Sequence, residues 1–359
     1  MSAYILRRLS YGLLVLIGVA TVVFMLFTIL PGDPARMMMG QRTDQETVDA
    51  IRKDLGLDKP VWIQYFHYLN DISPLSVHNA TDFENHWFAG KEKYGPHLTV
   101  FNLGDSKVIL KKPYLRQSWQ SRRHVSVILA EAFPKTLLLA SVSILIAIVL
   151  GIVMGSITAI INHPFINRAV LLVTVFGMSL PSFFAAILMA WIFAYLLADY
   201  TGLSMFGSLY TVDDFGNGEY LDLKNLILPA ITLGIRPLAI VVELTRTSLL
   251  DVFSQDYIRT AYAKGLKKRN VVGIHALKNA LNPVITAVSG WFASLLAGAV
   301  FVEYVFDWKG IGVVIVDALE KYDLPVLMGS VLLIAVILII INIFVDIIYG
   351  VLDPRIRIG

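Results

Sequence analysis

Long apolar segments are the feature of this sequence that most constrains its fold. A helix needs about 20 mostly apolar residues to cross the hydrocarbon of a membrane. Six segments meet this requirement: residues 9–30, 135–161, 168–198, 226–247, 283–302 and 325–350. The chain is 56% hydrophobic and only 16% charged, a composition that favours a membrane protein. We therefore expect an all-α integral membrane protein with six transmembrane helices.

The first segment reads as a retained membrane span. Arg7 and Arg8 precede an apolar run over 9–30, which exceeds the core of about 7–15 residues found in secretory signal peptides. The run ends at Pro31-Gly32-Asp33-Pro34 and not at a small-residue cleavage site.

The third, fourth and fifth segments contain residues that interrupt or shape a helix. Arg236, Pro237 and Glu243 interrupt the fourth, and Pro181 lies within the third. Each proline either kinks its span or marks an end of it. The fifth contains small residues that suit close packing between membrane helices. These are Gly290, Ala293, Ser294, Ala297, Gly298 and Ala299.

Charge distribution predicts the orientation. Residues 246–282 hold seven Lys and Arg against two acids, whereas 199–225 hold five acids against one Lys and 303–324 hold five acids against two Lys. Short basic loops stay in the cytoplasm. We expect both termini, with Arg7, Arg8, Arg355 and Arg357, and the turn at 162–168 to lie inside, with the two acidic loops outside.

This orientation divides the chain into three parts. They are a first transmembrane helix (1–30), a long extracytoplasmic segment (31–134) and a five-helix core (135–359) that contains the loop 246–282. The many basic residues of 31–134 do not oppose its export, because long segments translocate largely regardless of charge.

The segment 31–134 begins with a predicted pair of helices. Thr43 and Glu46 have the spacing of a capping box, and Gly56 supplies a stop. Pro60 then opens a second helix, whose apolar side consists of Trp62, Tyr65, Phe66 and Leu69. Residues 71–125 follow no regular pattern and receive no fold assignment.

The most basic stretch, Asp256 to Pro283, has the pattern of a helix–turn–helix between two spans. Gly265 can end the first helix, and Lys267, Lys268 and Arg269 then point to water or to lipid headgroups. Small residues at Ala261 and Ala263 allow a partner surface to come close. The alternative is an ordinary amphipathic loop held at the membrane surface by its charge.

The sequence lacks the motifs of a chain that does its own chemistry. It contains no GxxxxGK[ST], HExxH or GxSxG, so we expect no catalytic residue, and any ATP-driven work requires a partner subunit. There is no cysteine, and a net charge of +3 is too small to indicate nucleic acid. Five histidines lie in the segment 31–134 without metal-ligand spacing, so we expect no metal site. They are His67, His78, His86, His97 and His124.

Polar residues inside spans are costly and therefore candidates for function. Arg236 and Glu243 are seven residues apart and share a helix face, as do Asn342 and Asp346, which are four apart. They either line a passage or contact a second subunit, or they form hydrogen bonds between helices and reach toward the interface.

The stretch DYIRTAYAKG followed by HALKNALNPV resembles the EAA loop of ABC importer permeases, in the oligopeptide/dipeptide/nickel branch. Arg259, Thr260 and Ala261 stand where Glu-Ala-Ala is usual, Gly265 matches the glycine, and Lys278 replaces a final proline. Five further pieces resemble the branch in order. They are LPGDPA (30–35), LGLDKPVWIQY (55–65), NLGDS (102–106), PKTLLLA (134–140) and VDIIYGVLDPRIR (345–357).

The resemblance covers nearly the whole chain. The exceptions are about residues 71–100 and 107–125, which look longer than in the family, and Lys309, which replaces a usual proline.

The resemblance implies a permease subunit of a peptide importer in the bacterial inner membrane. Its partners would be a second permease subunit in a heterodimer, two ATPase subunits, an extracytoplasmic substrate-binding protein and membrane lipid. ATP and Mg would bind those ATPases, and no cofactor would bind this chain. A coupling helix would seat in one ATPase through Arg259, Thr260, Ala261, Ala263, Lys264, Gly265 and Leu266.

The alternative function is a stand-alone secondary transporter or channel. It needs coupling-ion carboxylates in mid-span and an inverted repeat, and neither is evident. A membrane enzyme or receptor is a third reading, and it lacks a catalytic constellation.

Overall fold

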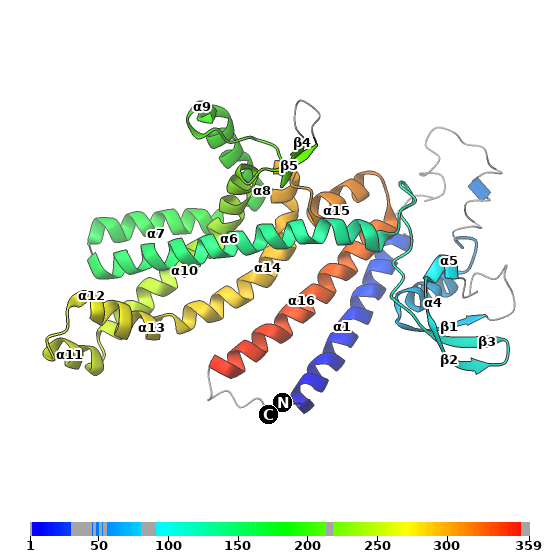
Figure 1. Ribbon diagram of the computed structural model, residues 1–359, viewed down its shortest axis with the longest axis horizontal. Helices are drawn as coiled ribbons and strands as arrows, with labels where there is room; N and C mark the ends of the chain where they lie inside the picture. Colours follow the sequence, from blue (N-terminus) through cyan, green and yellow to red (C-terminus); the bar gives the residue numbers. More distant parts are fainter. Residues whose placement is uncertain are drawn as a thin grey trace. The chain divides into compact units, whose positions relative to one another are not determined.

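The computed structural model describes residues 2–29, 45, 48–49, 52, 56–79, 91–161, 163–212 and 218–352. It is mostly helical (Figure 1). The chain forms two compact units. One combines Met1–Glu131 with Val314–Ile337, and the other combines Ala132–Val313 with Leu338–Gly359. The boundaries between them fall within helices.

Four continuous helices are long and apolar enough to cross a membrane. They are α1 (Ser2–Ile29), α6 (Val125–Ile161), α10 (Lys224–Phe253) and α16 (Leu324–Leu352). Two bent pairs also meet the test, so the described part of the chain holds four to six spans. The expected helical membrane protein is therefore confirmed.

The first bent pair occupies the third predicted span. α7 (Pro164–Ser179) is followed after a break at Leu180 and Pro181 by α8 (Ser182–Met189) and the π-helix η1 (Ala190–Leu196). The two halves are bent by 113°. Leu180 has an extended backbone, as expected for a residue before proline. Pro181 thus marks a break in the span.

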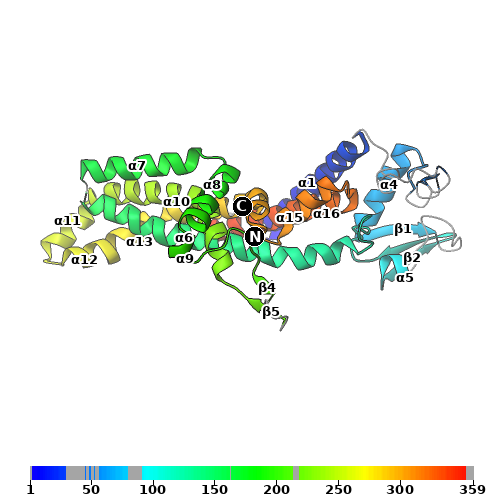
Figure 2. The ribbon, with the colours of Figure 1, turned by 90° about the horizontal axis from the view of Figure 1, so that it is seen from above.

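The fourth span is a single helix in spite of its two internal prolines. Pro229 and Pro237 both lie inside α10 without ending it. Of the residues in its most apolar stretch, 67% are buried. α10 packs against α7, α8 and α14 (Asn282–Phe306), and Figures 1 and 2 show α7 and α10 side by side. This burial explains how the helix that looked weakest in sequence is held in place.

Glycines allow α6 to approach α10 closely. A Cβ added at Gly155 would lie 2.6 Å from the carbonyl oxygen of Val242, and one at Gly151 would lie 2.6 Å from the Val241 side chain. Both distances are too short for a real side chain, so the contact requires glycine.

The turn after α14 closes over a fully buried carboxylate. Glu303 is 0% exposed and accepts a hydrogen bond from the backbone N–H of Gly312 at 2.6 Å. A Cβ at Gly310 would meet the same carboxylate at 2.5 Å. Lys309, which departs from the family's proline, instead forms an ion pair with Asp307.

Shorter helices connect these long ones. They are α4 (Val61–Ile72), α5 (Lys91–Tyr94), α9 (Ala198–Thr201), α11 (Asp256–Ala263), α12 (Lys268–Asn270), the π-helix η2 (Val271–Ala276), α13 (Leu277–Ala280) and α15 (Ile311–Glu320). The segment 56–125 also contains a three-stranded antiparallel sheet. Its strands are β1 (Leu75–Asn79), β2 (Leu98–Leu103) and β3 (Ser106–Leu110), in the order β1-β3-β2.

Local sequence explains part of this sheet. Gly104, with a φ of 60°, and Asp105 form the two-residue turn between β2 and β3, a residue pair typical of tight hairpins. A second hairpin joins β4 (Tyr210–Val212) to β5 (Glu219–Leu221). These sheets are additions to the helical fold that the sequence did not predict.

The predicted helix at Pro60 is confirmed as α4, and Gly56 has the positive φ of 70° expected where a helix stops. The capping-box residues Thr43 and Glu46 lie outside the described residues. α4 turns Tyr65 toward Phe24 of α1, with ring centroids 5.3 Å apart.

The apolar side expected for α4 is only partly buried. Trp62 and Phe66 are exposed, whereas Tyr65 and Leu69 pack against the buried cluster of Tyr68, Ala20, Phe24 and Leu332.

Candidate functional site

The basic loop, residues 256–283, forms the predicted helix–turn–helix. α11 ends at Ala263, and Gly265 follows with a φ of 78°, a left-handed conformation that glycine adopts without strain. The second helical part begins at Lys268 and runs through α12, η2 and α13. A 50° bend then separates it from α14.

A small apolar cluster fixes the basic loop to two long helices. Ile258 and Ala261 of α11 pack with Val271, Ala276 and Ala280 of the second helical part. Ala159 of α6 and Leu249 of α10 complete the cluster, and Leu249, Val271 and Ala276 are 0% exposed. Because close-packed interiors transmit displacement, a force on this loop would reach both helices.

The structure places the predicted coupling residues on two sides of α11. Ala261 is 6% exposed and faces the apolar cluster, so it does not present a small side chain to a partner as expected. The other predicted residues are all exposed. They are Arg259, Thr260, Ala263, Lys264, Gly265 and Leu266.

Sequence reasoning missed two exposed aromatic residues beside them. Tyr257 and Tyr262 are 42% and 44% exposed. The hydroxyl of Tyr257 accepts a hydrogen bond from the side-chain amide of Asn279 at 3.0 Å, which ties α11 to α13. Tyrosine is enriched at protein interfaces, so the residue type was the signal available in the sequence.

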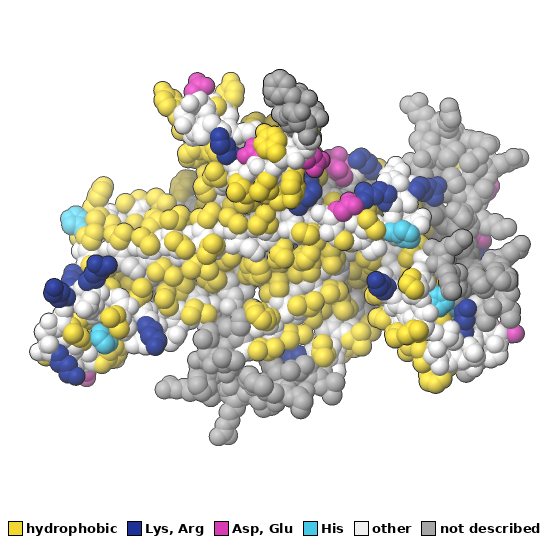
Figure 3. All heavy atoms as spheres, viewed as in Figure 1, with side chains coloured by type: hydrophobic (Ala, Val, Ile, Leu, Met, Phe, Trp, Pro, Cys, Tyr) yellow, Lys and Arg dark blue, Asp and Glu magenta, His cyan; other side chains and the backbone are white. Residues whose placement is uncertain are grey.

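Cations lie in the turn that follows α11 and at the start of the next helix. Lys264, Lys267, Lys268 and Arg269 are exposed, and the space-filling view shows Lys and Arg side chains gathered around α11 and α12 (Figure 3). Exposed small, aromatic and basic side chains together suit a surface that contacts another macromolecule.

Arg236 of α10 forms a hydrogen bond with the backbone at the break in the third span. Its Nη2 donates a hydrogen bond to the carbonyl oxygen of Leu180 at 3.0 Å, next to Pro181. Its buried Nε has no hydrogen-bond partner. A cavity of about 60 Å³ adjoins it, lined also by Trp291 and Ser294. The hydrogen bond supports the interhelical alternative, and the cavity keeps the pathway alternative open.

Glu243 belongs to a different cavity, although it shares a helix with Arg236. That cavity has a volume of about 160 Å³ and is lined by Asn167, Arg168 and Arg246 as well. Seven residues of α-helix rise about 10 Å, which explains the separation. On α16, Asn342 is exposed and Asp346 is half-buried, and neither lines either cavity. The four predicted pathway residues thus do not form one site.

A polar cluster in the segment 56–125 was not predicted at all. Asp71, at the end of α4, is 4% exposed and forms an ion pair with the Nε of Arg116 at 3.1 Å. It also accepts a hydrogen bond from the hydroxyl of Tyr94 at 2.9 Å. Its backbone carbonyl accepts from the Nζ of Lys111 and from the N–H of Tyr114.

Burial shifts the pKa of several groups in this cluster. It lowers the pKa of Lys111 to about 8, against the attraction of Asp71. It raises the pKa of Tyr114 to about 12, with Asp71 adding to the shift. The pKa of Tyr94 is raised as well, because of burial first and of Asp71 second. The cluster therefore holds its tyrosines neutral around the ion pair.

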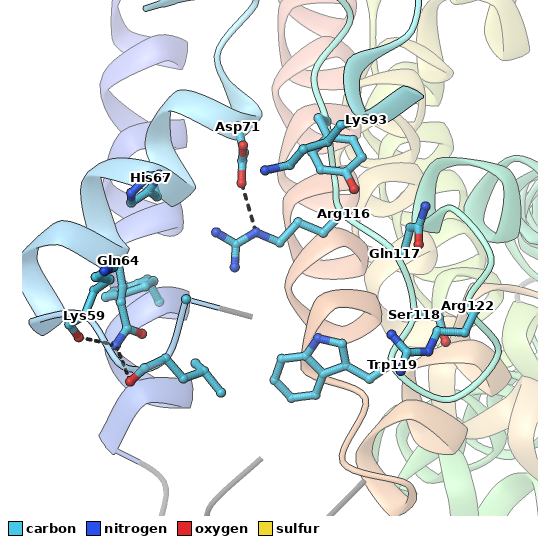
Figure 4. Close-up of a pocket in the computed structure, with 14 residues that line it drawn as sticks. Lys59, Gln64, His67, Asp71, Lys93, Arg116, Gln117, Ser118, Trp119 and Arg122 are labelled. Carbon is cyan, nitrogen blue, oxygen red and sulfur yellow. Dashed lines mark hydrogen bonds and ion pairs between the residues drawn. The ribbon is translucent and has the colours of Figure 1, made fainter. Parts of the chain in front are cut away.

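The cluster forms one wall of a cavity of about 200 Å³, here called the Arg116 pocket (Figure 4). Its lining includes Lys59, Gln64, Asp71, Arg116, Trp119 and Arg122. No spacing rule connects these residues, since they come from α4, from the residue pair before it and from a turn more than forty positions later. Within the described ranges, no group of three or more His, Asp or Glu side chains could hold a metal ion.

Comparison with known proteins identifies related chains. Residues 127–358 match the family described as "Binding-protein-dependent transport system inner membrane component", and residues 1–83 match the N-terminal family of the same systems.

Three curated relatives align over almost the full length of both chains. The "Dipeptide transport system permease protein DppB" of Alkalihalophilus pseudofirmus is 32% identical over 99% of this chain and 100% of its own. The "Di/tripeptide transport system permease protein DppB" of Pseudomonas aeruginosa is 34% identical, over 99% of both chains. The dipeptide permease protein DppB of Escherichia coli is 33% identical, over 99% of both.

A solved structure shares the fold. The inward-facing MetNI methionine ABC transporter contains a chain that superposes with a TM-score of 0.51 at 16% identity, covering 64% of this chain and 97% of that one.

Proposed function

Because the chain belongs to the family of inner membrane components of binding-protein-dependent transport systems, we propose that it moves peptides or similar small solutes as one subunit of an ATP-driven importer. The chain is an ABC importer permease of the peptide type, a multi-pass protein of the inner membrane. Curated relatives named as dipeptide and di/tripeptide permeases support this solute class.

The observation that carries the proposal is the basic loop, built as an anchored contact surface. The chain has no phosphate-binding loop of its own, so ATP and Mg would bind two partner ATPase subunits. A second permease subunit would complete the pathway as a heterodimer, and a substrate-binding protein would dock outside the membrane. The segment around the Arg116 pocket would then lie on that outer side.

In this proposal the exposed side of α11 seats in one ATPase. Arg259, Thr260 and Lys264 supply polar contacts, while Ala263, Gly265 and Leu266 allow close approach. Ala261 acts from behind, since it anchors α11 to α6 and α10. Closure of the ATPases would move the loop as a lever and switch the pathway between two arrangements.

Reconstitution separates this function from its alternatives. The full complex in proteoliposomes, with binding protein outside and ATP inside, is expected to accumulate a labelled dipeptide. The purified chain alone is expected to transport nothing. Uptake by the single chain, without ATPase subunits, would instead establish the stand-alone transporter or channel.

A pair of glycine substitutions tests the lever. Gly265→Val places a β-branched residue at a φ of 78°, where it is strained, and should lower ATP-driven uptake by roughly tenfold or more. Gly273→Val is the matched control. Gly273 lies in the same loop, has no neighbour within 4 Å of an added Cβ and has no positive φ. Full uptake by the Gly265→Val complex would overturn the proposed coupling role.

The polar residues of the spans are assigned to the pathway or the subunit interface. Arg236, beside its cavity, would line the passage at the break in the third span. Glu243 would contact the partner or line the passage near Arg246. Asn342 and Asp346 would face the second permease, because an amide exposed to hydrocarbon is costly.

The absence of cysteine makes this interface simple to test. A single Asn342→Cys variant can be paired with cysteines introduced into the second permease, without background thiols from this chain. A disulfide cross-link is expected from Asn342→Cys. Phe344→Cys, another exposed position of α16, is the control for a different helix face. Equal cross-linking at both positions, or none at Asn342, would contradict the assignment.

A further inference from the structure

We propose that the Arg116 pocket binds the terminal carboxylate of a peptide-type solute. The inference rests on the proposed function for the solute class, and on the pocket itself for the chemistry. It adds a carboxylate-recognition site to the permease chain.

The charge of the pocket favours an anion. Its lining contains four cationic side chains, those of Lys59, Lys93, Arg116 and Arg122, and one carboxylate, that of Asp71. The carboxylate is already engaged by the Nε of Arg116 and by the hydroxyl of Tyr94. Outside the lining, Asp58 pairs with Lys59 at 3.4 Å. The cations of the lining still outnumber its single carboxylate, and this excess of positive charge favours an anionic ligand.

The orientation of Arg116 suits a carboxylate in particular. Asp71 contacts only the Nε edge of the guanidinium. Figure 4 shows the far end of Arg116 directed away from Asp71, into the space between Gln64 and Trp119. A guanidinium whose terminal nitrogens face a cavity presents paired donors, which match the two oxygens of a carboxylate.

The turn from Arg116 to Arg122 is held in a costly conformation. Both arginines have left-handed backbones, with φ of 65° and 59°, which non-glycine residues rarely adopt. Such conformations persist where surrounding contacts enforce them, and they concentrate at ligand sites. A sequence of ordinary turn residues would close the same loop with less strain.

Specific contacts enforce this turn. The N–H of Arg122 donates to the carbonyl of Ser118 at 3.0 Å, and the N–H of Val125 donates to the carbonyl of Arg116 at 3.1 Å. Asp323 accepts hydrogen bonds from the Ser118 hydroxyl and from the backbone N–H of Trp119. The backbone at the two arginines is thus fixed before a ligand arrives, which lowers the entropic cost of ordering this turn on binding.

The size of the pocket limits the ligand to one end of a peptide. Its volume of about 200 Å³ is below the roughly 300–1,000 Å³ of most small-molecule sites. Phe24 and Trp119 supply an apolar wall beside the cations. A carboxylate with one apolar terminal residue satisfies both parts of this lining.

Binding to the full-length chain in zwitterionic nanodiscs tests the inference. The probes are alanylphenylalanine, its C-terminal amide and inorganic phosphate, measured by calorimetry. The free acid is expected to bind, and the amide to bind at least tenfold more weakly, since it lacks the charge that strengthens hydrogen bonds to arginine. Equal binding of acid and amide would overturn the inference.

Neighbouring arginines provide a matched pair of variants. Arg122→Asn removes a lining cation, and asparagine tolerates the left-handed backbone at this position. Arg123→Asn removes the same charge one residue later, from a side chain that pairs with Glu131 and does not line the pocket. We expect about tenfold weaker binding of the acid for the first and less than a twofold change for the second. Equal effects of the two variants would show that the acid is held by general charge attraction, and would overturn the proposed binding site.

Two further outcomes complete the test. Phosphate binding more tightly than the dipeptide, or displacement of the dipeptide by anionic phosphatidylglycerol in the nanodisc, would identify a phosphate or lipid site and overturn the carboxylate assignment. If Arg122→Asn does not fold, judged by its melting curve, the comparison of acid with amide on the unaltered chain decides.

The proposed function fails by a different observation. If the complete complex imports no peptide, the importer proposal is lost. If it imports peptides while the chain alone does not discriminate acid from amide, only the carboxylate site is lost.

Discussion

The basic loop and the segment 56–125 both carry many cations, but they place them differently. In the basic loop, Lys267, Lys268 and Arg269 are all exposed, and what is buried is a set of small and branched apolar side chains. In the segment 56–125, Lys111 is 5% exposed and Arg116 is paired with the buried Asp71. The same residue types form a contact surface in one region and an internal network in the other.

The difference lies in the acids and tyrosines nearby. In the basic loop, Asp256 is exposed, and its ion pair with Arg259 spans 3.5 Å at the surface, where such a pair contributes little. Asp71 is instead buried, and its carboxylate accepts hydrogen bonds from the side chains of Tyr94 and Arg116. Charge composition alone therefore does not predict what the charges in a segment do.

The largest expected effect comes from breaking the buried network. Asp71→Asn leaves Arg116 without its counter-ion and should destabilise the fold by about 2–4 kcal/mol, because an unpaired charge remains partly buried. The control is Asp58→Asn, which removes a carboxylate paired with Lys59 at an exposed position. Thermal melting of the purified chain in detergent measures both. Equal melting temperatures for the two variants would contradict the claim that the buried Asp71 network stabilises the fold more than the exposed ion pair of Asp58 does.

The next effect tests which side of α11 faces inward. Ala261→Leu inserts three carbon atoms into the apolar cluster and should cost about 1–3 kcal/mol in stability. Ala263→Leu makes the same change two residues away, where the side chain is exposed, and should change the melting temperature little. If Ala263→Leu were the more destabilising variant, the orientation of α11 would be reversed.

Ala263→Leu also has a functional readout. If the exposed face seats in an ATPase, this variant should weaken co-purification of the ATPase subunits although the chain itself melts normally. Unchanged assembly would show that Ala263 lies outside the contact.

A smaller effect is the pH dependence of stability that Lys111 introduces. Its pKa is about 8 in the folded chain and 10.5 when unperturbed, because burial disfavours the charged form. Between these pH values the unfolded chain binds the additional proton, so the contribution of Lys111 to stability rises with pH. The rise should be absent in Lys111→Met. The measurement is the difference in melting temperature between the unaltered chain and this variant at each pH from 7 to 10.

Tyr114 limits the upper end of that window. Burial raises its pKa to about 12, so above pH 10 the unfolded chain loses a proton that the folded chain keeps, and stability falls. If the difference in melting temperature between the unaltered chain and Lys111→Met stayed constant from pH 7 to pH 10, it would contradict a pKa of Lys111 that burial lowers.

The smallest expected effect is at the surface of the basic loop. Lys268→Gln should alter stability by no more than about 0.5 kcal/mol, since the side chain is exposed. Under the proposed function, the same change is expected to act on assembly with partner subunits or lipid. A loss of stability comparable to that of Asp71→Asn would show that this loop, too, depends on a charge network.

The sequence by itself determined the membrane character of the chain, the helix–turn–helix of the basic loop and the helix at Pro60. These features depend on signals within about thirty residues: apolar length, a glycine at a helix end and a proline at a helix start. The structure agrees for α1, α6, α10 and α16, and Gly265 has the expected left-handed backbone. The sequence also carried the family resemblance that the comparisons confirm.

Only the tertiary structure decided which polar and small residues act together. Arg236 meets the carbonyl of Leu180 across 56 residues, and Arg116 meets Asp71 across 45. Ala261 and Ala263 look alike in sequence, yet one is buried because Ala159 and Leu249 pack over it. Local periodicity specifies the face of a helix but not the partner that covers it, because that choice depends on packing between distant segments.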